Sequence, residues 1–98
     1  MVKHIVFWKL KSAGAGRAQG AQRIKALLES LRGRVEGMRH LEVGINFEAS
    51  DAAWDVALYC EFDSRSALDA YQDHPAHVAV KGEIGALRES RAVVDYEL

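Results

Sequence analysis

The sequence predicts an α+β fold in which four antiparallel strands form one sheet and the helices cover only one of its faces. The first observation is periodicity: apolar residues alternate with a period of two in four segments and recur at helical spacing between them. The second is the order of these segments, β-α-β-β-α-β with a break in the second helical region, which is the split arrangement of a ferredoxin-like sheet. The 98 residues fit one domain spanning 1–98.

The first predicted strand covers residues 2–11. Val6 and Trp8 fall on one face of it, and Ile5 and Phe7 fall on the other. Both faces therefore carry large apolar groups, although the helices can cover only one. We expect a second copy of the chain to cover the other face, which would make the protein a homodimeric α+β barrel.

A helix is predicted over residues 17–35, after a flexible break of small residues at 12–16. Its apolar positions have helical spacing: Ile24, Leu27, Leu28, Leu31 and Val35. Alternation predicts a second strand over 40–47 and a third over 54–62, separated by a polar turn at 48–53.

The C-terminal part is predicted to contain two helical segments and a last strand. Asp63 or Ser64 can cap a short helix that carries Tyr71. His74 and Pro75 interrupt that helix, because a residue before proline avoids the α region, and Pro75 suits the first turn of a new helix over 75–89. The last strand is predicted over 91–98.

Composition excludes several functional classes. The net charge is −1 and the basic residues are scattered, so we expect no nucleic-acid partner. The apolar run at the start is interrupted by Lys3, His4 and Lys9, so we expect no membrane span or signal segment and a cytoplasmic protein. Cys60 is the only cysteine, which excludes an intrachain disulfide, and its apolar surroundings favour a core position.

The candidate site is centred on His77. On a helix that begins at Pro75, His77 shares the apolar stripe with Val80 and Ile84 and should point toward the sheet. Burial and the positive end of the helix dipole favour a neutral imidazole, which can accept a proton. With Tyr71 and His4 it could form the polar part of a pocket for a small apolar or aromatic ligand. The expected apolar lining is Trp8, Trp54, Val56 and Ile84.

A purely structural reading is also open, in which Tyr71, His4 and His77 satisfy one another and nearby carbonyls in a small core. His74 would then serve as a helix cap, and His40 would be solvated. We expect no metal site, because Pro75 places His74 outside the helix that carries His77. The glycine-containing segment at 12–20 lacks the Lys-Ser/Thr ending of a phosphate-binding loop, and we expect no cofactor.

Four segments together resemble the stress-responsive A/B barrel domain family, often called Dabb: VKHIVFWKLK at the start, LEVGINF, WDVALYCEFDSRSALDAYQDHPAHVAV and ESRAVVDYEL at the end. The resemblance covers nearly the whole chain and implies a dimeric α+β barrel. Activity is not uniform in this family. One distantly similar plant member is olivetolic acid cyclase, a polyketide cyclase.

Similarity to that cyclase implies His77 as general base, Tyr71 as the phenol beside it and His4 as a further pocket histidine. The chain departs from the cyclase on the third strand, where a histidine is expected and Val56 or a neighbour stands. The sequence therefore favours a homodimeric domain of undetermined activity that binds a small apolar ligand. The alternative is a cofactor-independent polyketide cyclase or lyase, and a monooxygenase has only analogy of fold behind it.

Overall fold

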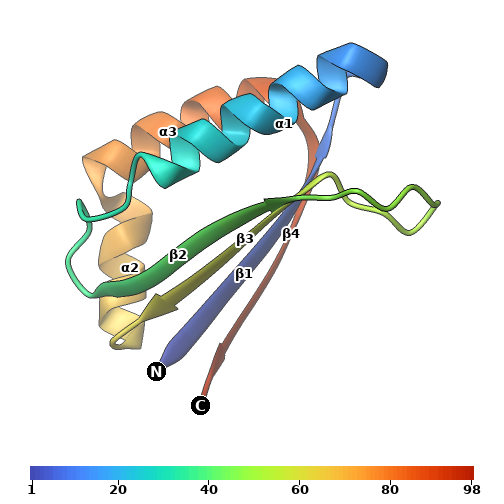
Figure 1. The fold of residues 1–98 in the computed structure, drawn as a ribbon. Coiled ribbons are helices and arrows are strands. Elements are labelled where there is room, and N and C mark those ends of the chain that lie inside the picture. The colour runs from blue at the N-terminus through green and yellow to red at the C-terminus, as the bar shows by residue number, and fades with distance from the viewer.

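The computed structural model describes residues 1–98, in which four strands form one antiparallel sheet in the order β2-β3-β1-β4. Figure 1 shows α1 and α3 on the same side of that sheet, with α2 at one end and no element on the opposite side. The elements follow one another in the predicted order: β1 (Val2–Leu10), α1 (Gly14–Glu29), β2 (Met38–Ile45), β3 (Val56–Phe62), α2 (Arg65–Asp73), α3 (Pro75–Leu87) and β4 (Arg88–Glu97).

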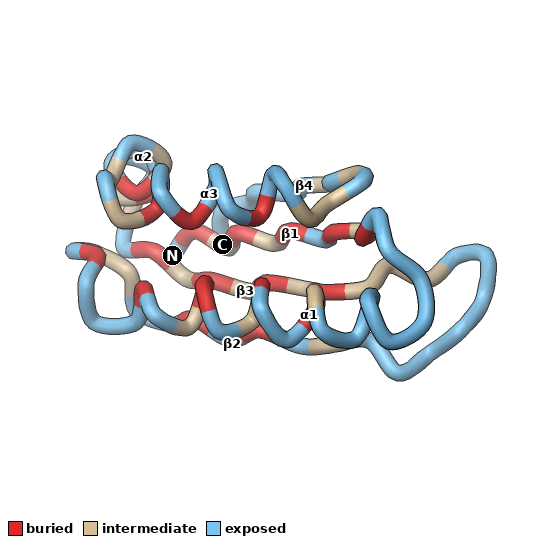
Figure 2. Tube along the Cα trace, turned by 90° about the horizontal axis from the view of Figure 1, so that it is seen from above, coloured by how far each residue is buried: buried red, intermediate tan, exposed pale blue.

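Strand β1 lies between β3 and β4 and determines which side chains face the helices. Its residues alternate in burial, as Figure 2 shows by colour, and His4, Val6 and Trp8 are all buried on the helix side. In the neighbouring strands, His4 pairs with Cys60 and Asp95. The predicted assignment of the two faces of this strand is therefore confirmed.

Helix α1 begins and ends earlier than the predicted range of 17–35. It covers Gly14–Glu29, and the chain then passes through turns in which Leu31 and Val35 remain buried. These two residues continue the apolar spacing because they pack into the core from the turns. The apolar spacing therefore predicted which residues are buried, and burial continues beyond the end of the helix.

The strand boundaries also differ from the prediction. Strand β2 ends at Ile45, so Phe47 is fully exposed, and Trp54 lies before the start of β3. Strand β4 begins at Arg88 because it pairs with β1 along nearly the whole length of that strand. Helix α3 consequently ends at Leu87, two residues before its predicted end.

The breaks around α2 follow the predicted chemistry. The Ser64 hydroxyl accepts a hydrogen bond from the amide of Ala67 and caps α2. His74 has an extended backbone, and its Nδ1 accepts a hydrogen bond from the amide of Ala76, which caps α3. Its predicted role as a cap is confirmed.

The core lies between the sheet and the helices. Cys60 is completely buried there, and burial raises the pKa of its thiol to about 12, so it is the core residue that the sequence indicated. On the other side of the sheet, Phe7, Val94 and Tyr96 remain exposed. No helix of the chain combines the length and the apolar character needed to cross a membrane.

Candidate functional site

His77 lies in the first turn of α3 and points toward the sheet. It is 7 % exposed, and Val80 and Ile84 on the same helix face are buried with it. The orientation follows from the spacing of three and four residues, which places all three side chains on one stripe. The predicted inward orientation of His77 is therefore confirmed.

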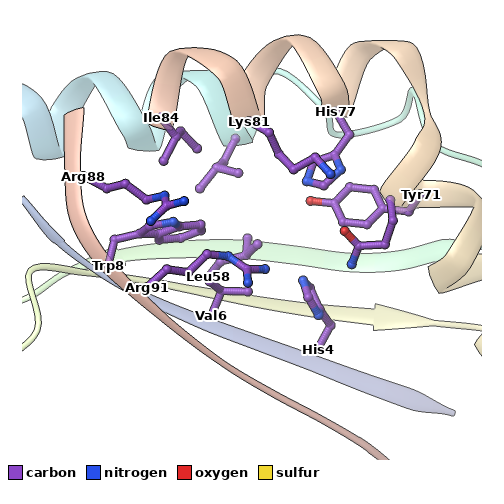
Figure 3. Close-up of a pocket in the computed structure, with 12 residues that line it drawn as sticks. His4, Val6, Trp8, Leu58, Tyr71, His77, Lys81, Ile84, Arg88 and Arg91 are labelled. Atoms are coloured by element: carbon purple, nitrogen blue, oxygen red, sulfur yellow. The ribbon is translucent and has the colours of Figure 1, made fainter. Parts of the chain in front are cut away.

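Tyr71 comes from the last full turn of α2, and the change of direction at His74 and Pro75 brings its ring onto His77. The two rings stack with centroids 3.9 Å apart and planes inclined by 25°. Tyr71 is completely buried, and its ring also packs against Phe62 in a tilted arrangement, with centroids 5.1 Å apart. The helix break thus places two aromatic side chains face to face over the sheet (Figure 3).

His4 completes this group from β1. Its ring meets the Tyr71 ring edge to face, with centroids 6.0 Å apart. His4 Nδ1 forms a hydrogen bond with the Asp95 carboxylate of β4. The Asp95 partner fixes the orientation of a buried imidazole, since one ring nitrogen is committed to it.

Two buried polar atoms in this group have no hydrogen-bond partner: the Tyr71 hydroxyl and His77 Nδ1. Tyr71 and His77 stack without a hydrogen bond between them, so these two side chains do not satisfy one another. Buried polar groups are normally hydrogen-bonded, and each exception has a cost of about 1 to 3 kcal/mol. Unpaired atoms of this kind are suited to a ligand that supplies the missing partner.

Burial also sets the protonation of these groups. It lowers the pKa of His77 to about 4, with smaller contributions in the same direction from Lys81 and His4, and the backbone of Gln72 only partly opposes the shift. The imidazole is therefore neutral at pH 7, as the sequence predicted. Burial raises the pKa of the Tyr71 phenol well above its ordinary value, so this hydroxyl keeps its proton and can donate it in a hydrogen bond.

These side chains border a cavity of about 260 Å³ between the sheet, α2, α3 and β4 (Figure 3). Of the predicted lining residues, it contains Trp8 and Ile84 together with His4, Tyr71 and His77. The full lining is His4, Val6, Trp8, Leu28, Leu58, Tyr71, Gln72, His77, Lys81, Ile84, Arg88 and Arg91.

Trp54 and Val56 were predicted to line this pocket, and the structure places them elsewhere. Trp54 precedes β3 and packs against Phe7, with ring centroids 6.4 Å apart, on the sheet face that carries no helix. Val56 is buried opposite Trp8 in the register but does not reach the cavity. The alternating pattern correctly predicted that Val56 is buried. The predicted strand began at Trp54, however, two residues before the observed start of β3.

Three basic residues of the lining were missed by the sequence reasoning: Lys81, Arg88 and Arg91. A signal existed for Lys81, because it follows His77 by four residues on one helix face. Arg91 lies opposite Trp8 in the register of β1 and β4, and Arg88 is the first residue of β4. Arg88 lay outside the predicted strand, which began at residue 91, and Arg91 was its first residue, whose neighbour on β1 depends on the register.

The other histidines do not join the site. His74 caps α3, and His40 lies on the open face of the sheet with its Nε2 at 2.7 Å from the Glu42 carboxylate. No group of three or more His, Cys, Asp or Glu side chains is arranged to hold a metal ion.

Comparison with known proteins places these features in a family. The model of the stress responsive A/B barrel domain family matches residues 2–98. An uncharacterized protein of Streptomyces coelicolor is 35 % identical over 82 residues, which are 81 % of each chain. A dimeric protein of unknown function with a ferredoxin-like fold, from Bacteroides fragilis, is 36 % identical with a TM-score of 0.87, covering 99 % of this chain and 95 % of that one.

A hydroxynitrile lyase from Passiflora edulis is more distant, at 20 % identity. Its structure matches with a TM-score of 0.82 over 99 % of this chain and 92 % of the lyase chain. At this identity the likeness concerns the fold alone, and the same fold can carry unrelated functions. The chemistry of this chain must therefore be argued from its own pocket.

Proposed function

The chain belongs to the stress responsive A/B barrel domain family, and we propose that it acts as a homodimer that binds a small molecule in the cavity between its sheet and its helices. The observation that carries this proposal is the pair of unpartnered buried atoms, Tyr71 hydroxyl and His77 Nδ1, at the wall of that cavity. A core under selection only for stability would be expected to satisfy or remove such atoms.

The apolar part of the ligand would lie against Val6, Trp8, Leu58 and Ile84, which form the hydrophobic walls. The Tyr71 hydroxyl would donate a hydrogen bond to an oxygen of the ligand. His77 Nδ1 would accept or donate, depending on the tautomer of the neutral ring. Small-molecule sites commonly combine apolar walls with a few such polar groups.

Binding can be tested with neutral aromatic alcohols, using the melting temperature as the readout. A ligand that binds only the folded state raises the melting temperature. Filling the cavity by Ile84→Phe should abolish the rise caused by benzyl alcohol, whereas Val78→Phe, at an exposed position of the same helix, should leave it intact. An equal rise in both variants would place binding outside this cavity and contradict the proposal.

The dimer is proposed to form through the open face of the sheet. Phe7, Val94 and Tyr96 expose between 37 % and 57 % of their surface there, and Trp54 packs beside Phe7. The Bacteroides fragilis relative is dimeric, which supports a second copy as the occupant of this face. Contiguous exposed apolar patches of this kind are typical of association surfaces.

Sedimentation at micromolar concentration tests the dimer. Phe7→Asp should give a monomer with a lower melting temperature, because it places a charge in the apolar face. Val78→Asp, on the helix side, should remain dimeric. A native protein that sediments as a monomer, or a Phe7→Asp variant of unchanged mass and melting temperature, would refute this assignment.

A second candidate function is a cofactor-independent cyclase or lyase reaction of the polyketide type. It is favoured by one observation: His77 is neutral and stacks on Tyr71 at the same cavity. In this reading His77 removes a proton next to a carbonyl, and Tyr71, with His4 beside it, stabilises the enolate. The pKa of about 4 argues for binding over catalysis, because so weak a base removes a carbon-bound proton slowly.

Exchange of carbon-bound hydrogen separates the two functions. If His77 acts as a base, the protein should accelerate deuterium exchange at the carbon next to the carbonyl of acetophenone, and His77→Gln should abolish the effect. Equal exchange with the native protein and with His77→Gln would exclude His77 as the base.

A further inference from the structure

The cavity carries three basic side chains: Figure 3 shows Arg88 and Arg91 together beside Trp8, while Lys81 extends toward His77. Lys81 of α3, Arg88 at the start of β4 and Arg91 of β4 line it, and no Asp or Glu is among the lining residues. The Asp95 carboxylate of β4, which contacts the lining residue His4, is not itself part of the lining. A ligand in this cavity would therefore meet three positive charges without a negative one.

These three side chains have no partner, a property they share with Lys9, Lys11 and Arg34. They differ from those residues because all three border one cavity. Six of the thirteen Lys and Arg residues form ion pairs with carboxylates: Lys3, Arg17, Arg23, Lys25, Arg39 and Arg65. Lys81, Arg88 and Arg91 form neither an ion pair nor a side-chain hydrogen bond, although they border one cavity. Lys81 and Arg91 are exposed, so water screens part of the repulsion among the three like charges, and an anion between them relieves the remainder.

Arg88 and Arg91 lie at the opposite end of the cavity from the Tyr71 hydroxyl and the His77 ring. Figure 3 shows Arg88 and Arg91 extending into the cavity beside Trp8, while the Tyr71 hydroxyl and the His77 ring face it from the helix break. Apolar walls lie between the two ends. A ligand that fits would carry a negative group at one end, a short apolar body and a polar atom toward Tyr71.

We propose that this pocket takes a small organic acid, with its carboxylate held by the guanidinium groups of Arg88 and Arg91. This inference rests on the proposed binding function and specifies its ligand class. The planar guanidinium group matches a carboxylate in bidentate geometry. Lys81 adds a third positive charge, and the body of the acid lies against Trp8 and Ile84 with its far end toward Tyr71 and His77.

The test compares phenylacetate with phenylacetamide, which has nearly the same shape but no charge. Both are titrated calorimetrically into the native protein. Because hydrogen bonds to charged groups contribute about 1.5 to 3 kcal/mol, phenylacetate should bind at least about tenfold more tightly than the amide. Fluorescence locates the site: in a Trp54→Phe background, Trp8 is the only tryptophan and lines the cavity.

Two variants complete the design. The double variant Arg88→Gln with Arg91→Gln should lose the preference for phenylacetate and keep the weak binding of the amide. Arg34→Gln, an exposed position without an ion pair, is the matched control and should keep the preference. Circular dichroism of each variant verifies that it is folded.

The outcomes separate this inference from the function on which it rests. Equal affinity for acid and amide, both with a change in Trp8 fluorescence, would overturn the acid assignment and leave small-molecule binding intact. Tighter binding of phenyl phosphate than of phenylacetate would overturn the choice of a carboxylate. No Trp8 response to any of the three probes would contradict small-molecule binding in this cavity as well.

Discussion

Replacing Tyr71 by phenylalanine removes a single oxygen atom whose role differs between a structural and a ligand-binding tyrosine. The hydroxyl is buried, has no hydrogen-bond partner and belongs to a residue that lines the cavity. The ring makes the packing contacts, with centroids 3.9 Å from His77 and 5.1 Å from Phe62. Phenylalanine preserves these contacts, so Tyr71→Phe tests the hydroxyl alone.

We expect Tyr71→Phe to stabilise the unliganded protein by about 1 kcal/mol. Burying a polar group without a hydrogen bond costs about 1 to 3 kcal/mol. The lower value applies because the adjoining cavity of about 260 Å³ has room for water. A ligand that accepts a hydrogen bond from this hydroxyl should lose about 1 kcal/mol of binding free energy, a roughly fivefold loss of affinity.

Urea unfolding followed by circular dichroism measures the change in stability. All proteins are compared at one concentration, because the stability of a dimer depends on it. Tyr59→Phe is the matched control: its hydroxyl donates a 2.6 Å hydrogen bond to Glu61, so its removal should lower the stability or leave it unchanged. The two tyrosines should thus respond in opposite directions.

A loss of 1 kcal/mol or more in Tyr71→Phe would refute the reasoning. It would mean that the hydroxyl makes a hydrogen bond on which the fold depends. Tyr71 would then be a structural residue, and the unpartnered atom that carries the binding proposal would disappear.

Three further predictions concern stability. Lowering the pH from 6.5 to 4 should destabilise the protein by up to about 3 kcal/mol, because the unfolded chain protonates His77 near pH 6.5 and the folded chain only near pH 4. The variant His77→Gln should lose this pH dependence. A native protein whose stability stays constant over that pH range would contradict the prediction. Gly37→Ala should lower the free energy of unfolding by about 2 kcal/mol or more, since φ is +83° and the new Cβ would lie 2.7 Å from Ala67 Cβ. Gly33→Ala, with φ +79° and open space around the new Cβ, should lower it by only about 1 kcal/mol. Equal losses of stability in the two variants would show that the close approach to Ala67 has no effect. Ser64→Ala should cost about 1 kcal/mol by removing the α2 cap, and an unchanged melting temperature would show that the cap is not needed.

The layout of the fold could be predicted because burial is periodic. Alternation along β1 and helical spacing along α1 and α3 each indicate which side of the element faces the core. The order of the elements then predicts a ferredoxin-like sheet. The ends of elements were less accurate. Leu31 and Val35 are buried from turns, and the start of β4 depends on pairing with β1, which local sequence does not encode.

The site was predicted where one element determines it and missed where two elements must be aligned. His4 and His77 were placed correctly because each belongs to an apolar face of its own strand or helix. Asp95, Arg88 and Arg91 were missed because their positions depend on the register between β1 and β4. The basic end of the pocket, and with it the charge of the proposed ligand, is a property of that register.

The most direct test of small-molecule binding at this site is nitrogen NMR of the four histidines during a titration with phenylacetate. We expect a saturable change in the His77 signals, and a smaller one at His4, while His40 and His74 stay constant because one lies on the open face and the other caps α3. Binding that leaves the His77 signals unchanged would contradict the account.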